Sequence, residues 1–269
     1  MNIVMSGNST VYTGMELAIY STLTHNKGIN WYIFTMDISI EDPDGRVIVY
    51  EGLVEWQREK LTKIVHYLDK TSRITFIDAA PYYAQYLENS VNNLSTFTPY
   101  AALRLIIDVA LPYLNDVLYF DCDVAVTDSF YSMYEECKMN KTKQAYAVYE
   151  PHACNSEGEM VSGVMFFNLD TARKNNFFSR ARHNYNVNLY VFPDQMAMRD
   201  SGTIDRLNET YGYMWDYRKN NHDPIILHFT CELSPKIYCT EPAHFFRVFP
   251  EFDYVQKGTR LLDVIHGTF

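Results

Sequence analysis

The chain has 269 residues, of which 47% are apolar and 21% are charged, and its formal net charge is −10 at neutral pH. This balance argues against a nucleic-acid-binding protein, which normally carries a basic stripe or patch. The length and apolar content suffice for a large buried core. No glycine-, proline- or serine-rich linker, low-complexity run or repeat divides the chain. We therefore predict one continuous α/β unit over residues 1–269.

The sequence also argues against a membrane span, a disulfide framework and a zinc site. No apolar stretch approaches the roughly 18 residues that cross a bilayer, and the opening Met1–Met5 is typical of a short strand rather than a signal peptide. The five cysteines include no Cys-x-x-Cys pair. We expect a cytoplasmic protein without a transmembrane segment, and peripheral attachment at the inner membrane face stays open.

In the first half of the chain, apolar strand-like runs alternate with amphipathic helical stretches. This alternation predicts a mostly parallel sheet covered by helices. The predicted strands are residues 3–6, 31–36, 73–77 and 117–120. The predicted helices are residues 12–25, 53–68 and 99–111, the last one ended by Pro112, and the polar segment 41–45 predicts a turn.

The second half is less regular. We predict strands at residues 144–149, 163–168 and 225–229, and helices at 171–188, at 193–199 and at 254–265. Pro193 suits the first turn of its helix. Ligands of such sheets bind beyond the carboxyl ends of the strands. Because Asp121, Asp123 and His228 all lie at predicted strand ends, we expect them to meet in one cleft.

The paired carboxylates Asp121 and Asp123 follow directly on the apolar strand 117–120. Two aspartates one residue apart at a strand end can reach one metal ion, which would neutralise a diphosphate and stabilise it as it leaves. Hard oxygen ligands with one imidazole suit Mn²⁺ or Mg²⁺ better than zinc. By itself an Asp-x-Asp pair is also compatible with a solvated loop.

The surroundings of this pair carry a family resemblance. The run from Tyr100 through Arg104 and Pro112 to Asp123 resembles the bacterial family 8 glycosyltransferases, which include lipopolysaccharide galactosyl- and glucosyltransferases and the glycogenin-like enzymes. Further matches follow in family order: Ile3–Asn8 with Tyr12, Ser162–Leu169, Pro193–Gln195, and His228-Phe229-Thr230. The resemblance covers about residues 2–240 and implies a single domain of the GT-A fold.

The resemblance also implies roles for individual residues. Asp121, Asp123 and His228 would ligate the metal, and Gln195 would lie beneath the anomeric carbon of the donor sugar. The expected contacts to the nucleotide sugar are Ser6, Gly7, Asn8 and Cys122 for uridine and ribose, Arg104, Asp194 and Glu150 for sugar hydroxyls, and Lys236 for the diphosphate. UDP-glucose or UDP-galactose is the expected donor. A saccharide or a glycolipid is the expected acceptor.

Several positions depart from the family pattern. Asn8 stands where many members have aspartate, Val161 where asparagine is usual, Met196 where a second aspartate is common, and Cys231 where glycine is usual; Lys236 is shifted. These departures leave the metal and diphosphate parts in better order than the parts that recognise the sugar. The donor sugar and the acceptor therefore stay open.

The family transfers a sugar with retention at the anomeric carbon. A retaining glycosidase uses a carboxylate nucleophile for this, whereas the amide of Gln195 is a poor nucleophile. We therefore expect a front-face departure of UDP, whose phosphate accepts the proton of the incoming hydroxyl. Asp194 is the alternative nucleophile. In this interpretation residues 1–125 form the nucleotide-binding half, and residues 126–269 form the acceptor-binding half with a C-terminal closing segment.

Other interpretations stay open. A phosphotransferase of the haloacid dehalogenase type also ends an apolar strand with Asp-x-Asp, although Ala125 stands where that family usually has threonine. A sugar-nucleotide or glycan-binding protein with weak catalysis would explain Val161 and the shifted Lys236. A self-glycosylating protein is suggested by the 22 tyrosines. Residues 186–192 and 211–222 are candidates for stacking on acceptor sugars or for loop packing.

Overall fold

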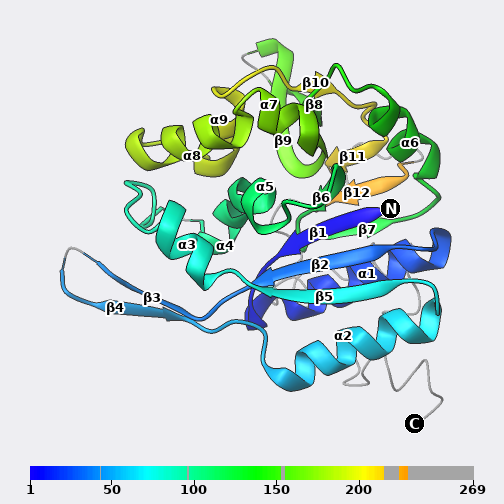
Figure 1. Cartoon of the computed structure of the whole chain (residues 1–269), viewed down its shortest axis with the longest axis horizontal. Helices are drawn as coiled ribbons and strands as arrows, with labels where there is room; N and C mark the ends of the chain where they lie inside the picture. The colour runs from blue at the N-terminus through cyan, green and yellow to red at the C-terminus, as the bar shows by residue number, and fades with distance from the viewer. Residues whose placement is uncertain (43, 96, 153–154, 215–223, 230–269) are drawn as a thin grey trace.

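The structure is a computed structural model that describes residues 1–229 apart from 43, 96, 153–154 and 215–223 (Figure 1). The helix predicted at residues 254–265 lies outside the described residues, as do Lys236 and Cys231. Among the described residues, no helix combines the length and apolarity that a membrane crossing needs.

A seven-stranded sheet with the order β10-β8-β9-β6-β1-β2-β5 forms the centre of the molecule. Its strands are β1 (Asn2–Ser6), β2 (Asn30–Thr35), β5 (Arg73–Asp78), β6 (Asp116–Phe120), β8 (Ala145–His152), β9 (Asn155–Asn168) and β10 (Asp205–Arg206). The strands β6, β1, β2 and β5 run parallel, whereas β9 runs antiparallel to both β6 and β8. The predicted mostly parallel sheet is confirmed.

Helices cover both faces of this sheet, and the alternation of side chains along its strands supplies a separate core to each face. In β6, Leu118 and Phe120 join one apolar cluster, whereas Val117 and Tyr119 join the other. The first cluster packs under α1 (Tyr12–His25), α2 (Glu55–Leu68) and α6 (Tyr131–Met139). The second packs under α3 (Ala80–Tyr86), α4 (Pro99–Ala102), the 3₁₀ turn η2 (Leu103–Ile106), α5 (Ile107–Ala110), α7 (Leu169–Lys174), α8 (Phe177–Val187) and α9 (Pro193–Arg199).

A three-stranded sheet lies beside the carboxyl end of β6. It consists of β11 (Tyr211–Met214), β12 (Ile226–His228) and β7 (Val124–Val126). Because β7 follows β6 after three residues and β12 pairs with it antiparallel, His228 lies opposite Val124. The small sheet therefore brings a residue from late in the chain next to the aspartate pair.

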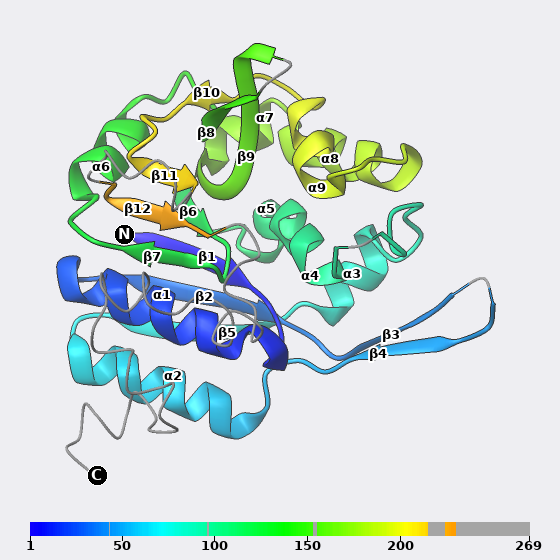
Figure 2. The same ribbon diagram turned by 180° about the vertical axis from the view of Figure 1, so that it is seen from behind.

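A two-stranded hairpin, β3 (Ile38–Glu41) and β4 (Val47–Tyr50), projects from the body of the molecule (Figures 1 and 2). The turn predicted at residues 41–45 lies at its tip, where the Gly45 N–H donates to the Asp42 carbonyl and Gly45 has a φ of 79°. The flanking strands were missing from the sequence prediction because their exposed valines lack the one-sided apolar alternation of a packed strand.

Two predicted helices are broken. Residues 99–111 form α4, η2 and α5 in succession, because the tighter η2 turn carries the Arg104 side chain into the interior. Residues 171–188 divide at Asn176, which has a φ of 52° and precedes α8. Asparagine tolerates this left-handed conformation better than most residues. The strand predicted at 163–168 is the end of the longer β9, and α3, α6, β7, β10, β11 and the 3₁₀ turn η1 (Ser9–Val11) were not predicted.

Candidate active site

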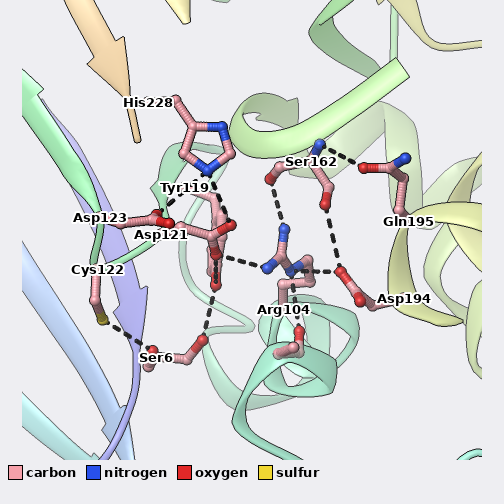
Figure 3. A network of polar contacts seen from close by, with 11 residues as sticks. Ser6, Arg104, Tyr119, Asp121, Cys122, Asp123, Ser162, Asp194, Gln195 and His228 are labelled. Atoms are coloured by element: carbon pink, nitrogen blue, oxygen red, sulfur yellow. Dashed lines mark hydrogen bonds and ion pairs between the residues drawn. The ribbon is translucent and has the colours of Figure 1, made fainter. Parts of the chain in front are cut away.

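The two aspartates and the histidine expected to meet do so at the carboxyl end of β6. The Asp121 N–H donates to the Gly163 carbonyl of β9 over 2.8 Å, which fixes the backbone just beyond the strand. On the other side, the Phe229 N–H donates to the Asp123 carbonyl over 2.9 Å, directly after β12. Three segments that are distant in sequence thus hold Asp121, Asp123 and His228 together (Figure 3).

The ligand atoms of these three residues have the spacing of a metal site. His228 Nε2 lies 3.2 Å from Asp123 Oδ1 and 3.8 Å from Asp121 Oδ2, and one atom from each residue falls within 4.8 Å of the others. Adjacent ligands of an octahedral ion with bonds of about 2.1 Å stand about 3 Å apart. The donor set of two carboxylates and one imidazole therefore fits a divalent cation after small adjustments, and Mn²⁺ or Mg²⁺ suits it by chemistry.

The charges at this cluster favour a cation. Burial raises the pKa of the Asp121 carboxyl; Arg104 opposes this shift, and the charge on Asp123 adds to it. Burial alone would lower the pKa of the His228 imidazole, but Asp123 and Asp121 outweigh burial and hold that pKa above its usual value. The four side chains Asp121, Asp123, Asp194 and Arg104 together carry a formal charge of −2, which matches a divalent cation in magnitude.

Gly163 makes room for the histidine. A Cβ atom at this position would lie 2.2 Å from Cε1 and 2.3 Å from Nε2 of His228, far inside van der Waals contact. The backbone of β9 therefore approaches the imidazole ring as only a glycine allows. Ser162-Gly163 was part of the resemblance, but the sequence did not say that this glycine packs against His228.

Arg104 is the centre of a second, buried network beside the metal cluster. Its guanidinium lies 2.6 Å from Asp121 Oδ1 and 3.0 Å from Asp194 Oδ2, and it donates to the Ser162 carbonyl over 2.5 Å. The guanidinium also stacks on the Tyr119 ring at 4.4 Å from its centroid. With a side chain only 3% exposed, Arg104 joins the metal cluster to Asp194 through an ion pair on each side.

Tyr119 links the metal cluster to the end of β1. Its hydroxyl contacts Asp121 Oδ1 at 2.9 Å and the Ser6 hydroxyl at 2.8 Å. The Cys122 thiol in turn donates to the Ser6 carbonyl over 3.2 Å. The expected nucleotide contacts Ser6 and Cys122 are therefore brought together next to Asp121, and Tyr119 is a site residue that the prediction missed. Strand alternation places residue 119 on the same face as residue 121, which was the available signal.

Gly7 and Asn8 continue from Ser6 at the same edge of the sheet. A Cβ atom on Gly7 would lie 2.5 Å from the Val11 side chain and 3.1 Å from Cys122 Sγ. Asn8 is buried, and its side-chain oxygen accepts hydrogen bonds from the Thr10 N–H and the Thr10 hydroxyl. That oxygen caps the η1 turn, so the Nδ2 amide group is the part of Asn8 that a nucleotide could use.

Asp194 and Gln195 lie on the first turn of α9, next to Ser162 (Figure 3). The Ser162 N–H donates to Gln195 Oε1 over 3.1 Å, and the Ser162 hydroxyl lies 3.5 Å from Asp194 Oδ2. Asp194 is 6% exposed. Ser162 thus orients both residues, a positioning role that the sequence analysis did not assign to it.

Two expected site residues are not placed at the cluster. Glu150 lies in β8, where it pairs in register with Glu159 of β9, and Lys236 is outside the described residues. Ser6, Arg104, Cys122, Asp123, Asp194, Gln195 and His228 lie in one polar network with Asp121 (Figure 3).

Comparison with known proteins identifies the family. Residues 2–235 match the family model of glycosyl transferase family 8, and the chain therefore belongs to that family. A comparison of the sequence with curated proteins gives no match. The family membership confirms the resemblance on which the interpretation of the aspartate pair depended.

Solved structures show the same fold at low sequence identity. The galactosyltransferase LgtC, in complex with donor and acceptor sugar analogues, superposes with a TM-score of 0.66 over 96% of both chains, at 14% identity. The apo form of WbbM, a bifunctional glycosyltransferase, superposes with a TM-score of 0.69 at 14% identity. The match covers 93% of this chain but only 49% of WbbM. GlyE of Streptococcus pneumoniae TIGR4 superposes with a TM-score of 0.63 at 16% identity, over 99% of this chain and 62% of GlyE. The fold is therefore the GT-A fold of glycosyltransferases.

Proposed function

We propose that this protein is a metal-dependent retaining glycosyltransferase that moves a hexose from a UDP-sugar to a saccharide or lipid-linked acceptor. The observation that carries the proposal is the convergence of Asp121, Asp123 and His228, with ligand atoms within 4.8 Å, at the carboxyl edge of the sheet. A bound divalent cation, with Mn²⁺ as our first choice, would supply positive charge to the departing diphosphate.

The protein's own residues divide the remaining tasks. Residues 1–125 would hold the nucleotide, with Ser6, Gly7, Asn8 and the backbone at Cys122 against uridine and ribose. Arg104, Asp194 and Glu150 would contact the hydroxyls of the donor sugar, and Lys236 would contact the diphosphate. Residues 126–269 would hold the acceptor. The boundary between these halves falls inside β7, and His228 of the second half joins the aspartates of the first.

The surroundings of α9 favour a front-face reaction without a covalent intermediate. The Asp194 carboxylate is buried and ion-paired with Arg104 at 3.0 Å, which weakens it as a nucleophile. The Ser162 N–H donates to Gln195 Oε1, and this hydrogen bond holds the Gln195 amide in place. Gln195 would position the anomeric carbon while UDP departs and its phosphate accepts the proton of the incoming hydroxyl. Catalysis then rests on positioning and on electrostatic stabilisation of the leaving group.

Thermal unfolding with nucleotide sugars tests the function. UDP-glucose or UDP-galactose should raise the unfolding temperature in the presence of Mn²⁺ and much less without it, since a ligand of the folded state stabilises it. Slow release of UDP from the same donor distinguishes an enzyme from a binding protein. Stabilisation without release of UDP would favour the binding protein, and no stabilisation by any UDP-sugar would overturn the proposal.

Two variants separate the mechanisms. The Asp194→Ala variant should retain more turnover than the Gln195→Ala variant if Asp194 is not a nucleophile, and intact-mass spectrometry with the donor should show no hexose adduct. A hexose adduct that disappears in Asp194→Ala would instead establish the covalent route. Adducts on other residues would indicate self-glycosylation. Release of phosphate from a simple aryl phosphate, blocked by Asp121→Asn, would revive the phosphotransferase interpretation.

A further inference from the structure

Two segments beside the proposed site contain no charged residue: the loop before α4, and the end of α8 with the loop that follows it. Residues 89–98 and 184–193 consist of asparagine, serine, threonine, proline, aromatic and aliphatic residues, although 21% of the whole chain is charged. The second segment runs directly into α9, which begins at Pro193 and carries Asp194 and Gln195. We call these two segments, apart from residue 96, the uncharged rim.

Hydrogen bonds join the two segments into one surface. The Asn92 side-chain amide donates to the carbonyls of Tyr185 and Asn188 over 2.5 and 2.7 Å, and its oxygen accepts from the Tyr190 N–H over 3.0 Å. The Val91 N–H donates to the Asn186 carbonyl over 3.2 Å. These amides are used inside the rim, so they are poorly placed to bind the hydroxyls of a sugar.

Aromatic side chains connect the rim to the start of α9. The Phe97 and Phe192 rings pack with their centroids 5.7 Å apart. Phe192 is the residue before Pro193 and stands three positions before Gln195. The rim therefore borders the turn of α9 that carries Asp194 and Gln195.

The side chains that the rim presents to solvent are mostly aliphatic. Leu189 is 80% exposed and Val191 is 72% exposed. The full set of exposed large apolar residues here is Val91, Leu94, Val187, Leu189, Val191 and Phe192. Scattered exposed apolar side chains are normal, but six of them on two hydrogen-bonded segments beside a reaction site favour a surface that binds an apolar partner.

The chemistry of these side chains selects the partner. Protein-binding hot spots are enriched in tryptophan, tyrosine and arginine and depleted in leucine and valine, and most of the exposed set is leucine or valine. A membrane-surface site normally adds lysine or arginine, whereas the rim has neither. The charges that follow the rim along the chain are paired: Asp194 with Arg104 at 3.0 Å, and Arg199 with Asp200 at 2.9 Å. An uncharged hydrocarbon chain fits this surface better than a protein or an anionic bilayer.

We propose that the uncharged rim binds the alkyl chain of a lipid-linked saccharide acceptor whose sugar approaches the donor sugar held at Gln195, an assignment that rests on the proposed function. The rim then supplies acceptor affinity through buried hydrocarbon, while Asp194 and Gln195 hold the donor sugar that the acceptor hydroxyl attacks. The hydrogen bonds within the rim hold the backbones of its two segments together before the acceptor arrives.

Alkyl glycosides test this directly. Binding of methyl and octyl β-D-galactopyranoside, and of the matching glucosides, is measured by calorimetry below the micelle concentration with Mn²⁺ and UDP present. Each buried methylene is worth a factor of about four in affinity. If three of the seven additional methylenes are buried, the octyl glycoside should bind about 60-fold more tightly than the methyl glycoside.

Two variants locate the effect. Leu189→Ser combined with Val191→Ser should reduce the octyl-to-methyl preference to below about 5-fold, because it removes the two most exposed aliphatic side chains of the rim. The unfolding temperature should change by no more than about 2 °C, as for most surface substitutions. Met139→Ser, a substitution of a residue 76% exposed on α6, is the matched control and should keep the full preference.

The outcomes separate this inference from the proposed function. Equal affinity for methyl and octyl glycosides, or a preference that survives the double substitution, overturns the inference. A wild-type dimer that dissociates in the double variant would also overturn the inference. The same holds if the protein sediments with phosphatidylcholine vesicles but shows no preference for the octyl glycoside. Absence of a thermal shift with UDP-sugars concerns the proposed function alone, because alkyl binding is measured independently of transfer and can be repeated without UDP.

Discussion

Strand β6 has an aspartate at each end, and the two carboxylates differ in what surrounds them. At the amino end, Asp116 is 7% exposed and accepts a hydrogen bond from the Tyr134 hydroxyl over 2.6 Å. At the carboxyl end, Asp121 contacts the Tyr119 hydroxyl and Arg104, and it also faces a second carboxylate and an imidazole. Each end therefore pairs an aspartate with a buried tyrosine hydroxyl, but among the described residues only the carboxyl end also brings a second carboxylate and an imidazole within reach of one metal ion.

The difference shows why an aspartate at a strand end does not by itself identify a metal site. The contact between Asp116 and Tyr134 ties α6 to the sheet, which is a structural role. At the other end, Arg104 is shared between Asp121 and Asp194, so one guanidinium serves two carboxylates while Asp123 adds a third. Negative charge concentrated in a partly buried place favours a bound cation. The carboxyl end of β6 is thus suited to bind a metal, whereas the amino end is suited to hold a helix.

The strongest test of the difference between the two ends of β6 is to neutralise one aspartate at each end. Asp123→Asn removes a proposed metal ligand and should lower donor turnover about 1,000-fold, equivalent to about 4 kcal/mol of transition-state stabilisation. Stabilisation by Mn²⁺ in thermal unfolding should disappear as well. Release of UDP from the donor is the measurement.

The matched variant is Asp116→Asn at the other end of the strand. It weakens the hydrogen bond from Tyr134 and should lower the free energy of unfolding by about 1–2 kcal/mol, with turnover and the Mn²⁺ effect retained. Equal losses of turnover in both variants would show that the two ends of β6 do not differ in function.

Replacement of the shared guanidinium addresses the stability of the carboxyl end. Arg104→Lys keeps the charge but cannot reach Asp121, Asp194 and the Ser162 carbonyl at once, since lysine lacks the planar fork of donors. The free energy of unfolding should fall by about 3 kcal/mol, the lower end for a buried ion pair left incomplete. Urea unfolding measures this loss. The control Arg173→Lys alters a half-buried arginine that binds backbone carbonyls, and it should cost less than Arg104→Lys.

The sequence predicted the parallel sheet and the meeting of Asp121, Asp123 and His228 well, because both depend on local patterns. Apolar runs set the strands, and a strand that ends in Asp121-Cys122-Asp123 necessarily delivers its carboxylates to the carboxyl edge of a parallel sheet. The position of Arg104 was less accessible, since an apolar stripe does not distinguish α-helical from 3₁₀ turns and the break into η2 depends on the buried contacts of Arg104 itself.

The supporting residues were missed for a different reason. Tyr119, Ser162 and Gly163 act through contacts between segments that are far apart in the chain, such as the 2.9 Å contact from Tyr119 to Asp121 and the packing of Gly163 on His228. No local pattern specifies such contacts. The asparagine-rich segment 186–192 allowed either sugar stacking or loop packing, and only the hydrogen bonds of Asn92 show that the loop packing is real.

Gly163→Ala sharpens the comparison at the metal end without changing any charge. The added methyl group must displace the His228 ring, because the Cβ position lies 2.2 Å from it. We expect about 2 kcal/mol of destabilisation and at least about a 30-fold loss of Mn²⁺ affinity, as for misplaced ligands. Gly212→Ala is the control, since its Cβ would crowd Val148 at 2.9 Å and no metal ligand. Equal Mn²⁺ affinities in the two variants would exclude His228 as a ligand.

The smallest expected effect comes from the two tyrosine hydroxyls, and it compares the two ends of β6 most directly. Tyr119→Phe removes the contacts to Asp121 and Ser6. Tyr134→Phe removes the hydrogen bond to Asp116 and the one accepted from the Asn2 N–H. Each variant loses one buried hydroxyl, so each should lower the free energy of unfolding by about 1 kcal/mol. Only Tyr119 orients a proposed metal ligand, and partners of this kind typically change metal affinity 10- to 100-fold.

We therefore expect Tyr119→Phe to weaken Mn²⁺ binding about 10-fold, while Tyr134→Phe leaves Mn²⁺ binding at the wild-type value. Calorimetric titration with Mn²⁺ gives both affinities, and urea unfolding gives the matched stabilities. If both variants bound Mn²⁺ equally well, Tyr119 would be a structural contact like Tyr134. The carboxyl end of β6 would then owe its metal affinity to the ligands alone, because Arg104 would suffice to hold the Asp121 carboxylate in place.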